Sequence, residues 1–517
     1  MGSDHVESVE LVRKRFIHDN PDIEIHPGTT DMNSPREQTT YVKTKIVATV
    51  GPAIQEKAQL RQLVEAGVDV FRLNFAHGKH DWLAGIVTAL REVSRQLNRP
   101  IGILADLAGP KIRLEEIPGG SVRCELGQDF IFARVPDPGD PRVYTCTYDK
   151  LIDDLRVNDR IVLADGSVAL RVTGKPPSND RVVCIVEQPG EIRSRQGVNL
   201  PGVALSTPSL TPKDLKDLAW ALKNEIDFVS LSFVRSAHDL EHLRAEIDRL
   251  APTRVPQIVS KIEKVEAVQE LDRILELTDV VMVARGDLGV EADLAQVPIL
   301  QKRIIRLCNQ HRIPVITATQ MLESMTHNNL PTRAEATDVA NAVLDGTDAV
   351  MLSGETAIGE YPLDTVRMMS RIAREAERVL PTSRPVETTG ELRSRALAVT
   401  EAVTLGAVKA AGQLSADLIV VVTKTGKTAM ALSWLRGNTP VIALTDDPAV
   451  ARRLTLCWGI TPICTSVAQK SPKEILRFVT EWGRKEQILT SGSKIVLVAS
   501  SATSDIAHDL MLVHSVP

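Results

Sequence analysis

Short apolar segments alternate with helical stretches along most of the chain, and this alternation limits the fold more than any other feature. From residue 45 onward, eight apolar segments each end in polar or glycine residues and precede a helical pattern. Near-continuous apolar segments between helices indicate parallel strands covered on both faces, and eight such units favour a closed (β/α)8 TIM barrel. The expected strands are 45–50, 70–75, 101–106, 228–233, 257–263, 280–284, 314–319 and 349–353.

The spacing of strands and helices breaks once, after the third strand, where the chain shows alternating segments between turn signals. Alternation with a period of two, as at 182–187, is typical of strands, so we expect an inserted small β-barrel lid domain. A second α/β pattern follows the eighth unit, with strands expected at 418–422, 441–444 and 494–498, and favours a separate open sheet. The predicted domains are an N-terminal extension (1–40, with an amphipathic helix at 6–17), the barrel (41–108 and 209–380), the lid (109–208) and a C-terminal α/β regulatory domain (381–517).

Charge and cysteine content argue against several classes of partner. The 61 basic and 66 acidic residues give a net charge of -5 without a basic block, so nucleic acid is not an expected partner. No apolar run approaches the roughly 20 residues that a membrane span needs, so a membrane is not expected either. The six cysteines form no C-x-x-C pair, which in a chain of 517 residues favours reduced thiols and a cytoplasmic location.

Polar residues gather where the expected barrel strands end, which is where barrels of this type carry their active sites. Lys261 and Glu263 lie two positions apart in an extended segment and therefore share one face. Lysine supplies a compact cation, arginine binds phosphate bidentately, and carboxylates are the ligands that Mg²⁺ or Mn²⁺ prefers. The strand-end residues are Arg72, Asn74, Asp106, Lys261, Glu263, Arg285, Gly286, Asp287, Thr317, Thr319 and Gln320.

Each of these residues, taken alone, has a structural alternative. A lysine or glutamate at a strand end is more often half of an ion pair, Thr319 alone would be a core hydroxyl, and His77 alone would be a surface or packing histidine. Asp106 is the strongest single candidate, because a lone carboxylate after an apolar strand costs free energy when it is buried unpaired. Their joint occurrence is what favours a site for a phosphate and a divalent metal.

A second candidate site lies in the C-terminal domain, between an apolar strand and a helical pattern. It is not a Walker A loop, because Val421 stands where the first glycine is required. Its hydroxyls, ammonium groups and backbone N–H groups are nevertheless suited to hold a phosphate, which predicts an effector site. The residues are Thr423, Lys424, Thr425, Gly426, Lys427 and Thr428.

Six segments carry a family resemblance. They are TKIVATVGP at 44–52, FRLNFAHG at 71–78, SKIE at 260–263, VARGDLGVE at 283–291, ATQMLESM at 318–325 and PTRAEATDVAN at 331–341. In this order they resemble pyruvate kinase, and the resemblance runs from about residue 43 to the C-terminus. The family's architecture, a barrel with a β lid after strand three and a C-terminal regulatory domain, agrees with the layout predicted above.

The resemblance implies phosphoryl transfer from phosphoenolpyruvate to ADP, which yields pyruvate and ATP at the last step of glycolysis. It implies Mg²⁺ or Mn²⁺ at Glu263 and Asp287, with Lys261 beside the phosphoryl group to stabilise the transition state. Arg72 would hold the phosphoryl group, while Gly286, Asp287 and Thr319 would hold the substrate carboxylate. Thr319 would also belong to the proton route to the enolate, whose donor stays open. The nucleotide contacts would be Pro52, Asn74, Phe75, Ala76, His77, Arg113 and Lys213.

Three departures from the family pattern touch its K⁺ site. Leu107 and Ala76 lack the hydroxyl oxygens that K⁺ would use, and Lys111 places a fixed positive charge where many members have a carboxylate. Asn74 and Asp106 would then be what remains of a monovalent-cation site. The sequence therefore predicts activity without K⁺, as in the family's lysine-bearing branch.

The C-terminal domain also departs from part of the family. Its late loop, 499–505, lacks the Gly-rich pattern with Trp and Arg of members that fructose 1,6-bisphosphate activates. The expected allosteric effector is therefore a monophosphate, such as a sugar phosphate or AMP. A homotetramer is expected from the family alone.

Two other functions remain open at this point. A barrel lyase or aldolase acting on pyruvate or oxaloacetate with Mg²⁺ would need the same carboxylates and cation, although the lid and the nucleotide-side motifs argue against it. A metabolite sensor without turnover would keep the regulatory domain, although the presence together of Arg72, Lys261, Glu263, Asp287 and Thr319 argues against that.

Overall fold

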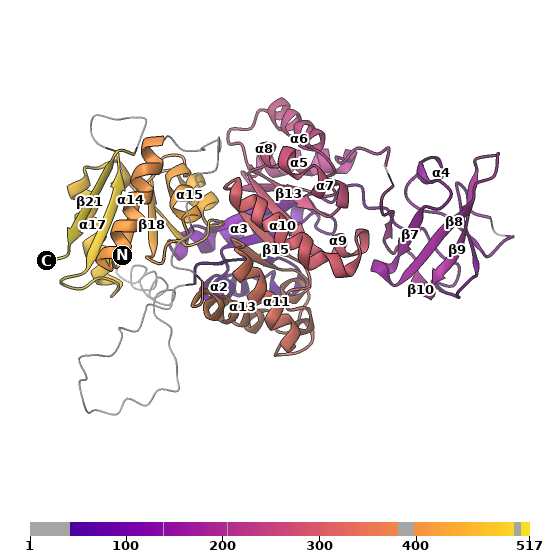
Figure 1. Ribbon diagram of the computed structural model, residues 1–517, viewed down its shortest axis with the longest axis horizontal. Coiled ribbons are helices and arrows are strands. Elements are labelled where there is room, and N and C mark those ends of the chain that lie inside the picture. The colour runs from indigo at the N-terminus through magenta and orange to yellow at the C-terminus, as the bar shows by residue number, and fades with distance from the viewer. Residues whose placement is uncertain (1–41, 138, 204, 381–397, 501–507) are drawn as a thin grey trace.

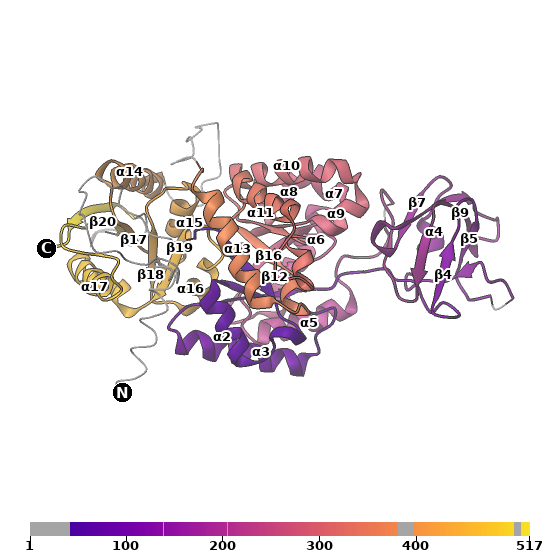
Figure 2. The same cartoon turned by 90° about the horizontal axis from the view of Figure 1, so that it is seen from below.

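Three bodies lie in a row in this protein (Figure 1). The computed structural model describes residues 42–137, 139–203, 205–380, 398–500 and 508–517. A helix-covered barrel lies in the centre, with the inserted β domain at one end and the C-terminal α/β domain at the other, and Figure 2 shows the same order from below. The helix expected at 6–17 lies outside the described residues.

Eight parallel strands close the central barrel in the order β1-β16-β15-β14-β13-β12-β3-β2, which confirms the predicted TIM barrel. Nearly all of their residues are buried, because helices cover the outside and side chains fill the inside. Each strand ends within two residues of its predicted end. The strands are β1 (Lys45–Thr49), β2 (Val70–Asn74), β3 (Gly102–Asp106), β12 (Phe228–Leu231), β13 (Gln257–Ile262), β14 (Val280–Ala284), β15 (Val315–Ala318) and β16 (Ala349–Leu352).

Helices connect the strands and cover the barrel (Figure 1). The helix that resumes the barrel after the insert has Thr211 as its N-cap, which accepts a hydrogen bond from the Asp214 N–H, and Pro212 in its first turn. The helices are η1 (Pro52–Ile54), α2 (Lys57–Ala66), α3 (His80–Gln96), α5 (Pro212–Lys223), α6 (Ala237–Leu250), α7 (Val265–Gln269), α8 (Leu271–Leu277), α9 (Arg285–Glu291), η3 (Leu294–Gln296), α10 (Val297–Gln310), η4 (Glu323–Thr326), α11 (Arg333–Asp345), α12 (Gly354–Ala357) and α13 (Pro362–Glu377).

The insert after β3 is a small β domain with its own apolar core. Its main element is a curled six-stranded sheet in the order β11-β7-β8-β9-β5-β6, beside a two-stranded ribbon of β10 and β4. The rings of Phe130 and Tyr144 stack in the core with centroids 4.1 Å apart. The elements are β4 (Ser121–Cys124), β5 (Asp129–Ala133), β6 (Val143–Tyr144), α4 (Leu151–Asp154), β7 (Arg160–Leu163), η2 (Ala164–Gly166), β8 (Val168–Gly174), β9 (Arg181–Gln188), β10 (Gly190–Arg193) and β11 (Val198–Asn199).

The C-terminal domain is a five-stranded sheet in the order β19-β18-β17-β20-β21, with helices on its faces (Figure 1). The first four strands are parallel, and β21 is antiparallel to β20. The sequence predicted three of these strands and missed β19 and β21. The elements are α14 (Ala398–Leu414), β17 (Leu418–Val422), α15 (Lys427–Trp434), β18 (Val441–Thr445), α16 (Pro448–Leu454), β19 (Ile460–Cys464), η5 (Ser466–Gln469), α17 (Pro472–Lys485), β20 (Lys494–Ala499) and β21 (Leu510–Ser515).

The C-terminal domain contacts the amino ends of the barrel strands, opposite the lid. The buried Arg436 forms an ion pair with Asp348, 2.7 Å between Nη2 and Oδ1, just before β16. The Nζ of Lys45, the first residue of β1, donates to the carbonyl of Ile460 at 2.6 Å.

No helix in the described part of the chain is long and apolar enough to cross a membrane. The predicted residue limits of the domains stay predictions.

Candidate active site

Two cations and a carboxylate meet at the carboxyl ends of β2, β3 and β13. Asp106, the last residue of β3, accepts from Arg72 Nε at 2.7 Å and lies 3.3 Å from Lys261 Nζ. It also accepts from Ser230 Oγ at 2.5 Å. Burial alone would raise the pKa of Asp106, but Lys261 and Arg72 outweigh it and lower this pKa to about 2. Asp106 is therefore a permanent anion that anchors both cations.

Lys261 is a buried cation with three acceptors around its ammonium. Its ammonium lies 2.9 Å from Glu263 Oε1, 3.3 Å from Asp106 Oδ1 and 2.7 Å from Ser232 Oγ. Burial alone would lower its pKa, but the carboxylates of Asp106 and Glu263 raise the pKa of Lys261 to about 12. This lysine is therefore positively charged near neutral pH.

Glu263 and Asp287 are the candidate metal ligands. Glu263 is buried just beyond β13, and Asp287 lies in the first turn of α9. Burial raises the pKa of Glu263 above its ordinary value; the Lys261 ammonium opposes this and the Asp287 carboxylate adds to it. Two carboxylates that repel each other fit a divalent cation. The described residues contain no group of three or more His, Cys, Asp or Glu able to hold a metal, so water or substrate would supply further ligands, as is usual for Mg²⁺.

Thr319 and the start of α9 lie together. The Gly286 N–H donates to Thr319 Oγ1 at 2.7 Å, and the Thr319 hydroxyl donates to the Ala318 carbonyl at 2.6 Å. Thr319 follows β15 with φ of 68°, a backbone conformation that is strained for a β-branched residue. The Arg285 guanidinium holds this turn by donating to the Thr319 carbonyl at 2.7 Å. The Gly286 N–H at the start of α9 thus faces the Thr319 side chain, and both groups are predicted to bind the substrate carboxylate.

The predicted nucleotide residues lie around the ends of β1 and β2, with one on the lid. Asn74 Oδ1 accepts from the Ala76 N–H at 3.0 Å, and Lys213 Nζ donates to the Phe75 carbonyl at 2.7 Å. These bonds bring Asn74, Phe75, Ala76 and Lys213 into one loop cluster. The other three are Pro52 in η1, His77, whose N–H donates to the Asn74 carbonyl, and Arg113, whose Nη1 donates to the Arg195 carbonyl in the lid.

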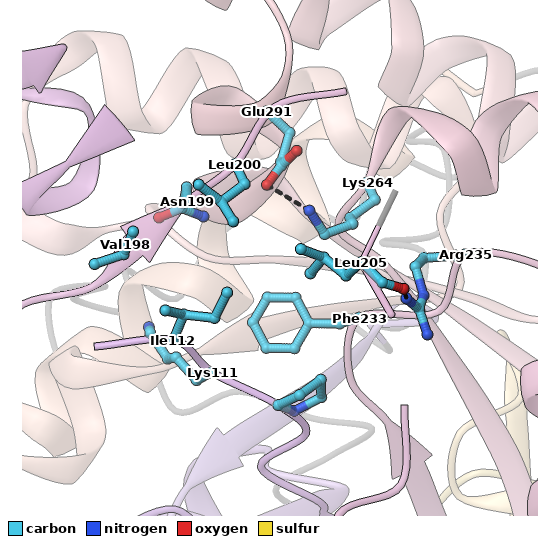
Figure 3. Close-up of a pocket in the computed structure, with 11 residues that line it drawn as sticks. Lys111, Ile112, Val198, Asn199, Leu200, Leu205, Phe233, Arg235, Lys264 and Glu291 are labelled. Carbon is cyan, nitrogen blue, oxygen red and sulfur yellow. Dashed lines mark hydrogen bonds and ion pairs between the residues drawn. The ribbon is translucent and has the colours of Figure 1, made fainter. Parts of the chain in front are cut away.

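A narrow cleft lies between the lid and the barrel beside this site. Figure 3 shows the Phe233 ring beside Ile112 and Leu205, and a dashed line between the buried pair Lys264 and Glu291, whose Nζ and Oε1 lie 2.7 Å apart. Lys111 is exposed and lines the same cleft. Asp106 has Arg72 and Lys261 as its ion-pair partners among the described residues, so Lys111 is not brought into contact with it.

The predicted effector loop runs between β17 and α15, as expected from the sequence. Thr423 Oγ1 accepts from the Gly426 N–H at 3.0 Å, and Gly426 caps α15 with φ of 87°, a conformation that favours glycine. Thr428 Oγ1 lies 3.0 Å from His508 Nδ1. Most of the late loop, 501–507, lies outside the described residues.

The sequence reasoning missed the residues at the end of β12. Ser230 and Ser232 bond to Asp106 and Lys261, and the Phe233 N–H donates to Glu263 Oε2 at 2.7 Å. The strand itself was predicted, and Ser230 and Ser232, two positions apart at its end, share one face of it. That spacing was the available signal, but serine is too common in strands for the spacing to indicate a site.

The chain is similar to known proteins over most of its length. Residues 41–366 match the family described as "Pyruvate kinase, barrel domain", and residues 401–514 match "Pyruvate kinase, alpha/beta domain". It is 40% identical to a pyruvate kinase of Sporosarcina psychrophila over 91% of this chain and 80% of that protein. It is also 40% identical to pyruvate kinase 2 of Synechocystis, over 89% of this chain and 76% of that protein.

A solved structure agrees with both the sequence and the fold. The crystal structure of a pyruvate kinase from Cryptosporidium parvum superposes with a TM-score of 0.83 at 34% identity, and covers 92% of this chain and 96% of that one. Family matches of this extent, on a closed barrel with the predicted strand-end residues in contact, leave no room for a lyase with only a similar barrel. The chain belongs to the pyruvate kinase family and is a phosphotransferase.

Proposed function

We propose that the protein transfers the phosphoryl group of phosphoenolpyruvate to ADP with Mg²⁺ or Mn²⁺ bound, giving pyruvate and ATP. The observation that carries this proposal is the buried Lys261 ammonium, held by two carboxylates beside Arg72 at the carboxyl end of the barrel. Phosphoryl transfer needs little covalent chemistry from a protein. It needs fixed positive charge around the transferring group, and this arrangement supplies it.

Lys261 acts through its charge. Negative charge grows on the enolate oxygen and on the phosphoryl group as the bond between them breaks, and a cation held in a water-poor site stabilises that charge strongly. The pKa of about 12 keeps this lysine from serving as a proton donor near neutral pH. The proton that reaches the enolate carbon therefore has another source, which we place on the Thr319 side of the site through water.

Arg72 is suited to hold the phosphoryl group. A guanidinium has five N–H donors, and Arg72 directs Nε and Nη2 at Asp106 and Nη1 at Thr49 Oγ1. Donors remain for a phosphoryl oxygen, while the contacts to Asp106 and Thr49 fix the plane of the group. We assign Gly286, Asp287 and Thr319 to the substrate carboxylate, since the first N–H groups of a helix have no partner within the helix and suit an anion. The Gly286 N–H donates to Thr319 Oγ1 in this structure, and a substrate carboxylate would take the place of that contact.

Glu263 and Asp287 would hold the divalent metal. A divalent metal held there would supply positive charge against the phosphoryl oxygens. The protein's own part includes the orientation of Glu263: the Phe233 N–H and Lys261 fix its two carboxylate oxygens. Such second contacts are what hold a metal ligand in place.

The nucleotide would bind on the β1 and β2 side of the site. Lys213 and the backbone of 74–77 form one hydrogen-bonded cluster there, and Arg113 approaches from the lid. We propose that the lid closes over both substrates and keeps out water that would hydrolyse the phosphate.

The remaining assignments rest on the resemblance and on sequence departures. We propose that the enzyme works without K⁺, with Asn74 and Asp106 left from a cation site and Lys111 as the replacement charge. We propose a phosphorylated effector at the Thr423–Thr428 loop, a homotetramer and a cytoplasmic location. The loop between β17 and α15, with hydroxyls and an N-terminal helix turn, supports the effector assignment.

One assay tests the function and the cation assignment together. Pyruvate formation from phosphoenolpyruvate and ADP with Mg²⁺ is measured in Na⁺ and K⁺ buffers of equal ionic strength, for the unchanged protein, for Lys261→Met and for Lys57→Met. Lys57 lies on the outside of the barrel and pairs with Glu92 there, so its variant controls for the loss of a lysine.

We expect equal, rapid turnover in both salts, loss of at least about 10³-fold in Lys261→Met and no loss in Lys57→Met. A large stimulation by K⁺ would contradict the cation proposal and leave the kinase proposal standing. No turnover in either salt, with or without added sugar phosphate or AMP, would favour the alternative of a metabolite sensor without catalytic activity.

A further inference from the structure

The end of β12 touches all three charged groups at the centre of the site without contributing a charge of its own. Ser230 Oγ donates to Asp106 at 2.5 Å, Ser232 Oγ accepts from Lys261 Nζ at 2.7 Å, and the Phe233 N–H donates to Glu263 at 2.7 Å. Ser230 and Ser232 are buried, so these bonds form away from bulk water. Buried hydrogen bonds to charged groups are stronger than those between neutral groups.

Ser232 completes the contacts of the Lys261 ammonium. An ammonium has three N–H donors, and Asp106, Glu263 and Ser232 provide three acceptors for them. The hydroxyl of Ser232 donates its own proton to the Leu107 carbonyl at 2.7 Å. Its lone pairs must therefore face Lys261, so the direction of this acceptor is set before any substrate arrives.

The neutrality of Ser232 matters as much as its position. Asp106 and Glu263 already bring two negative charges to the ammonium, and a third carboxylate here would add one more against the phosphoryl oxygens. A hydroxyl fixes the ammonium without adding a negative charge. The contact with Asp106, at 3.3 Å, is the longest of the three and is the one that a phosphoryl oxygen can replace, whereas Ser232 stays bound at 2.7 Å.

The backbone around Ser232 leaves it little freedom. Phe233 has φ of 55°, which aims its N–H at Glu263 and turns the chain out of the strand. The neighbouring loop presses on this turn at Gly109, where an added Cβ would lie 2.9 Å from the Phe233 ring and 3.1 Å from the Ser232 Cβ. The loop after β3 and the end of β12 thus lock each other.

We propose that Ser232 is a positioning residue for phosphoryl transfer: it holds the Lys261 ammonium at the transferring group without adding a negative charge there. This inference rests on the proposed role of Lys261. In this arrangement Ser230 supports Asp106 and Phe233 supports Glu263. The end of β12 thus positions the charged groups that β3 and β13 contribute.

The test is the rate of the chemical step in Ser232→Ala. Rapid-quench single turnover of phosphoenolpyruvate and ADP with Mg²⁺ measures ATP formation apart from product release. Because a displacement of about 1 Å can cost on the order of 100-fold in rate, we expect a loss of about 10- to 100-fold. The KM values for both substrates should stay within about twofold, since the lost bond stabilises the transition state rather than the bound substrates. Ser232→Cys places a weaker acceptor of similar shape at this position. Its single-turnover rate should lie between that of the unchanged protein and that of Ser232→Ala.

Ser260→Ala is the matched control. Ser260 precedes Lys261, is fully buried, and bonds through Oγ to Thr278 Oγ1 at 2.8 Å, away from the site. Its variant loses a comparable hydrogen bond and should keep the single-turnover rate.

Three results would overturn the proposal: a Ser232→Ala rate within twofold of the unchanged protein, an equal loss in Ser260→Ala, or a loss confined to KM. A Lys261→Met protein that keeps its rate would instead refute the proposed role of Lys261, so the two failures are distinguishable.

Discussion

Two buried carboxylates differ in what compensates their charge. Asp106 has two cations and a serine hydroxyl, and its pKa falls to about 2. Glu486, just after α17, has an Oε2 without a hydrogen-bond partner among the described residues, and burial raises its pKa to about 7 against the opposing charge of Lys485. The first acid stabilises the folded protein when it is ionised, and the second destabilises it.

This difference predicts how Glu486 affects stability with pH. Its pKa is about 4.5 in an ordinary setting and about 7 in the fold, so the folded state binds the proton more tightly. The stability that protonated Glu486 provides is complete below about pH 4.5 and is lost as the pH rises through about 7. Glu486→Gln should therefore raise the free energy of unfolding at pH 8 by about 1–2 kcal/mol and change it little at pH 4.5.

Urea unfolding at the two pH values measures this effect. Glu474→Gln is the control, because Glu474 is an exposed acid in the first turn of the same helix and caps it through Ser471. That variant should gain nothing at pH 8. A Glu486→Gln protein no more stable at pH 8 than the unchanged protein would contradict the prediction.

The short helix α9 connects the substrate side of the site to the lid. Its first turn presents Gly286 to Thr319. Its last residue, Glu291, pairs with Lys264 and lines the cleft to the lid together with Asn199. Burial raises the pKa of Glu291, while Lys264 and Asn199 oppose the rise. One short helix of seven residues thus lies between the substrate side of the site and the cleft that separates the lid from the barrel.

Breaking the Lys264–Glu291 pair on one side only should be costly. Glu291→Leu leaves a buried ammonium unpaired, and we expect a loss of about 3 kcal/mol in the free energy of unfolding. The double variant Glu291→Leu, Lys264→Met removes both charges and should recover most of this loss. Chemical unfolding of the two variants decides the matter, and a double variant as unstable as the single one would show that the charges are not the cause.

Element types were predictable from the sequence, but the contacts between elements were not. All eight barrel strands follow from apolar runs, whereas β19 contains Pro462 and β21 is an edge strand of half-exposed alternating residues, so neither gives the same signal. The strand-end charges were found because their residue types are unusual there. Ser230 and Ser232 were missed because their roles depend on register: β12 aligns Ser230 with Asp106, more than 100 residues away, and no local pattern reveals that.

At the scale of the whole molecule, one buried arginine joins the C-terminal domain to the barrel. Arg436 follows α15, pairs with Asp348 and donates to the carbonyls of Gly346 and Thr347. It also stacks over the Trp458 ring at 4.5 Å from the centroid. Because α15 begins at the predicted effector loop, this arginine lies at the far end of the same helix from that loop.

Arg436→Met should weaken the contact between the C-terminal domain and the barrel and so lower the stability of the C-terminal domain. It leaves the buried Asp348 without its cation, and we expect a loss of about 3 kcal/mol, seen in calorimetry as an earlier transition for the C-terminal domain. Arg254→Met is the control, since Arg254 pairs with Asp447 across the same boundary but is more exposed, and such pairs contribute about 0–1 kcal/mol. Equal effects of the two variants would contradict the special weight given to Arg436.

The closed barrel also determines the order in which a growing chain can become structured. β1 pairs with β16, where Lys45 aligns with Ala349, and β3 pairs with β12, which follows the whole insert in the chain. A nascent chain therefore carries unpaired strand edges until synthesis of the barrel is nearly complete. The lid core, in contrast, is formed by residues 112–203 alone. The lid can therefore fold on the ribosome while the barrel that carries it is still unfinished, and the interval before β16 emerges is when this protein is most exposed to aggregation.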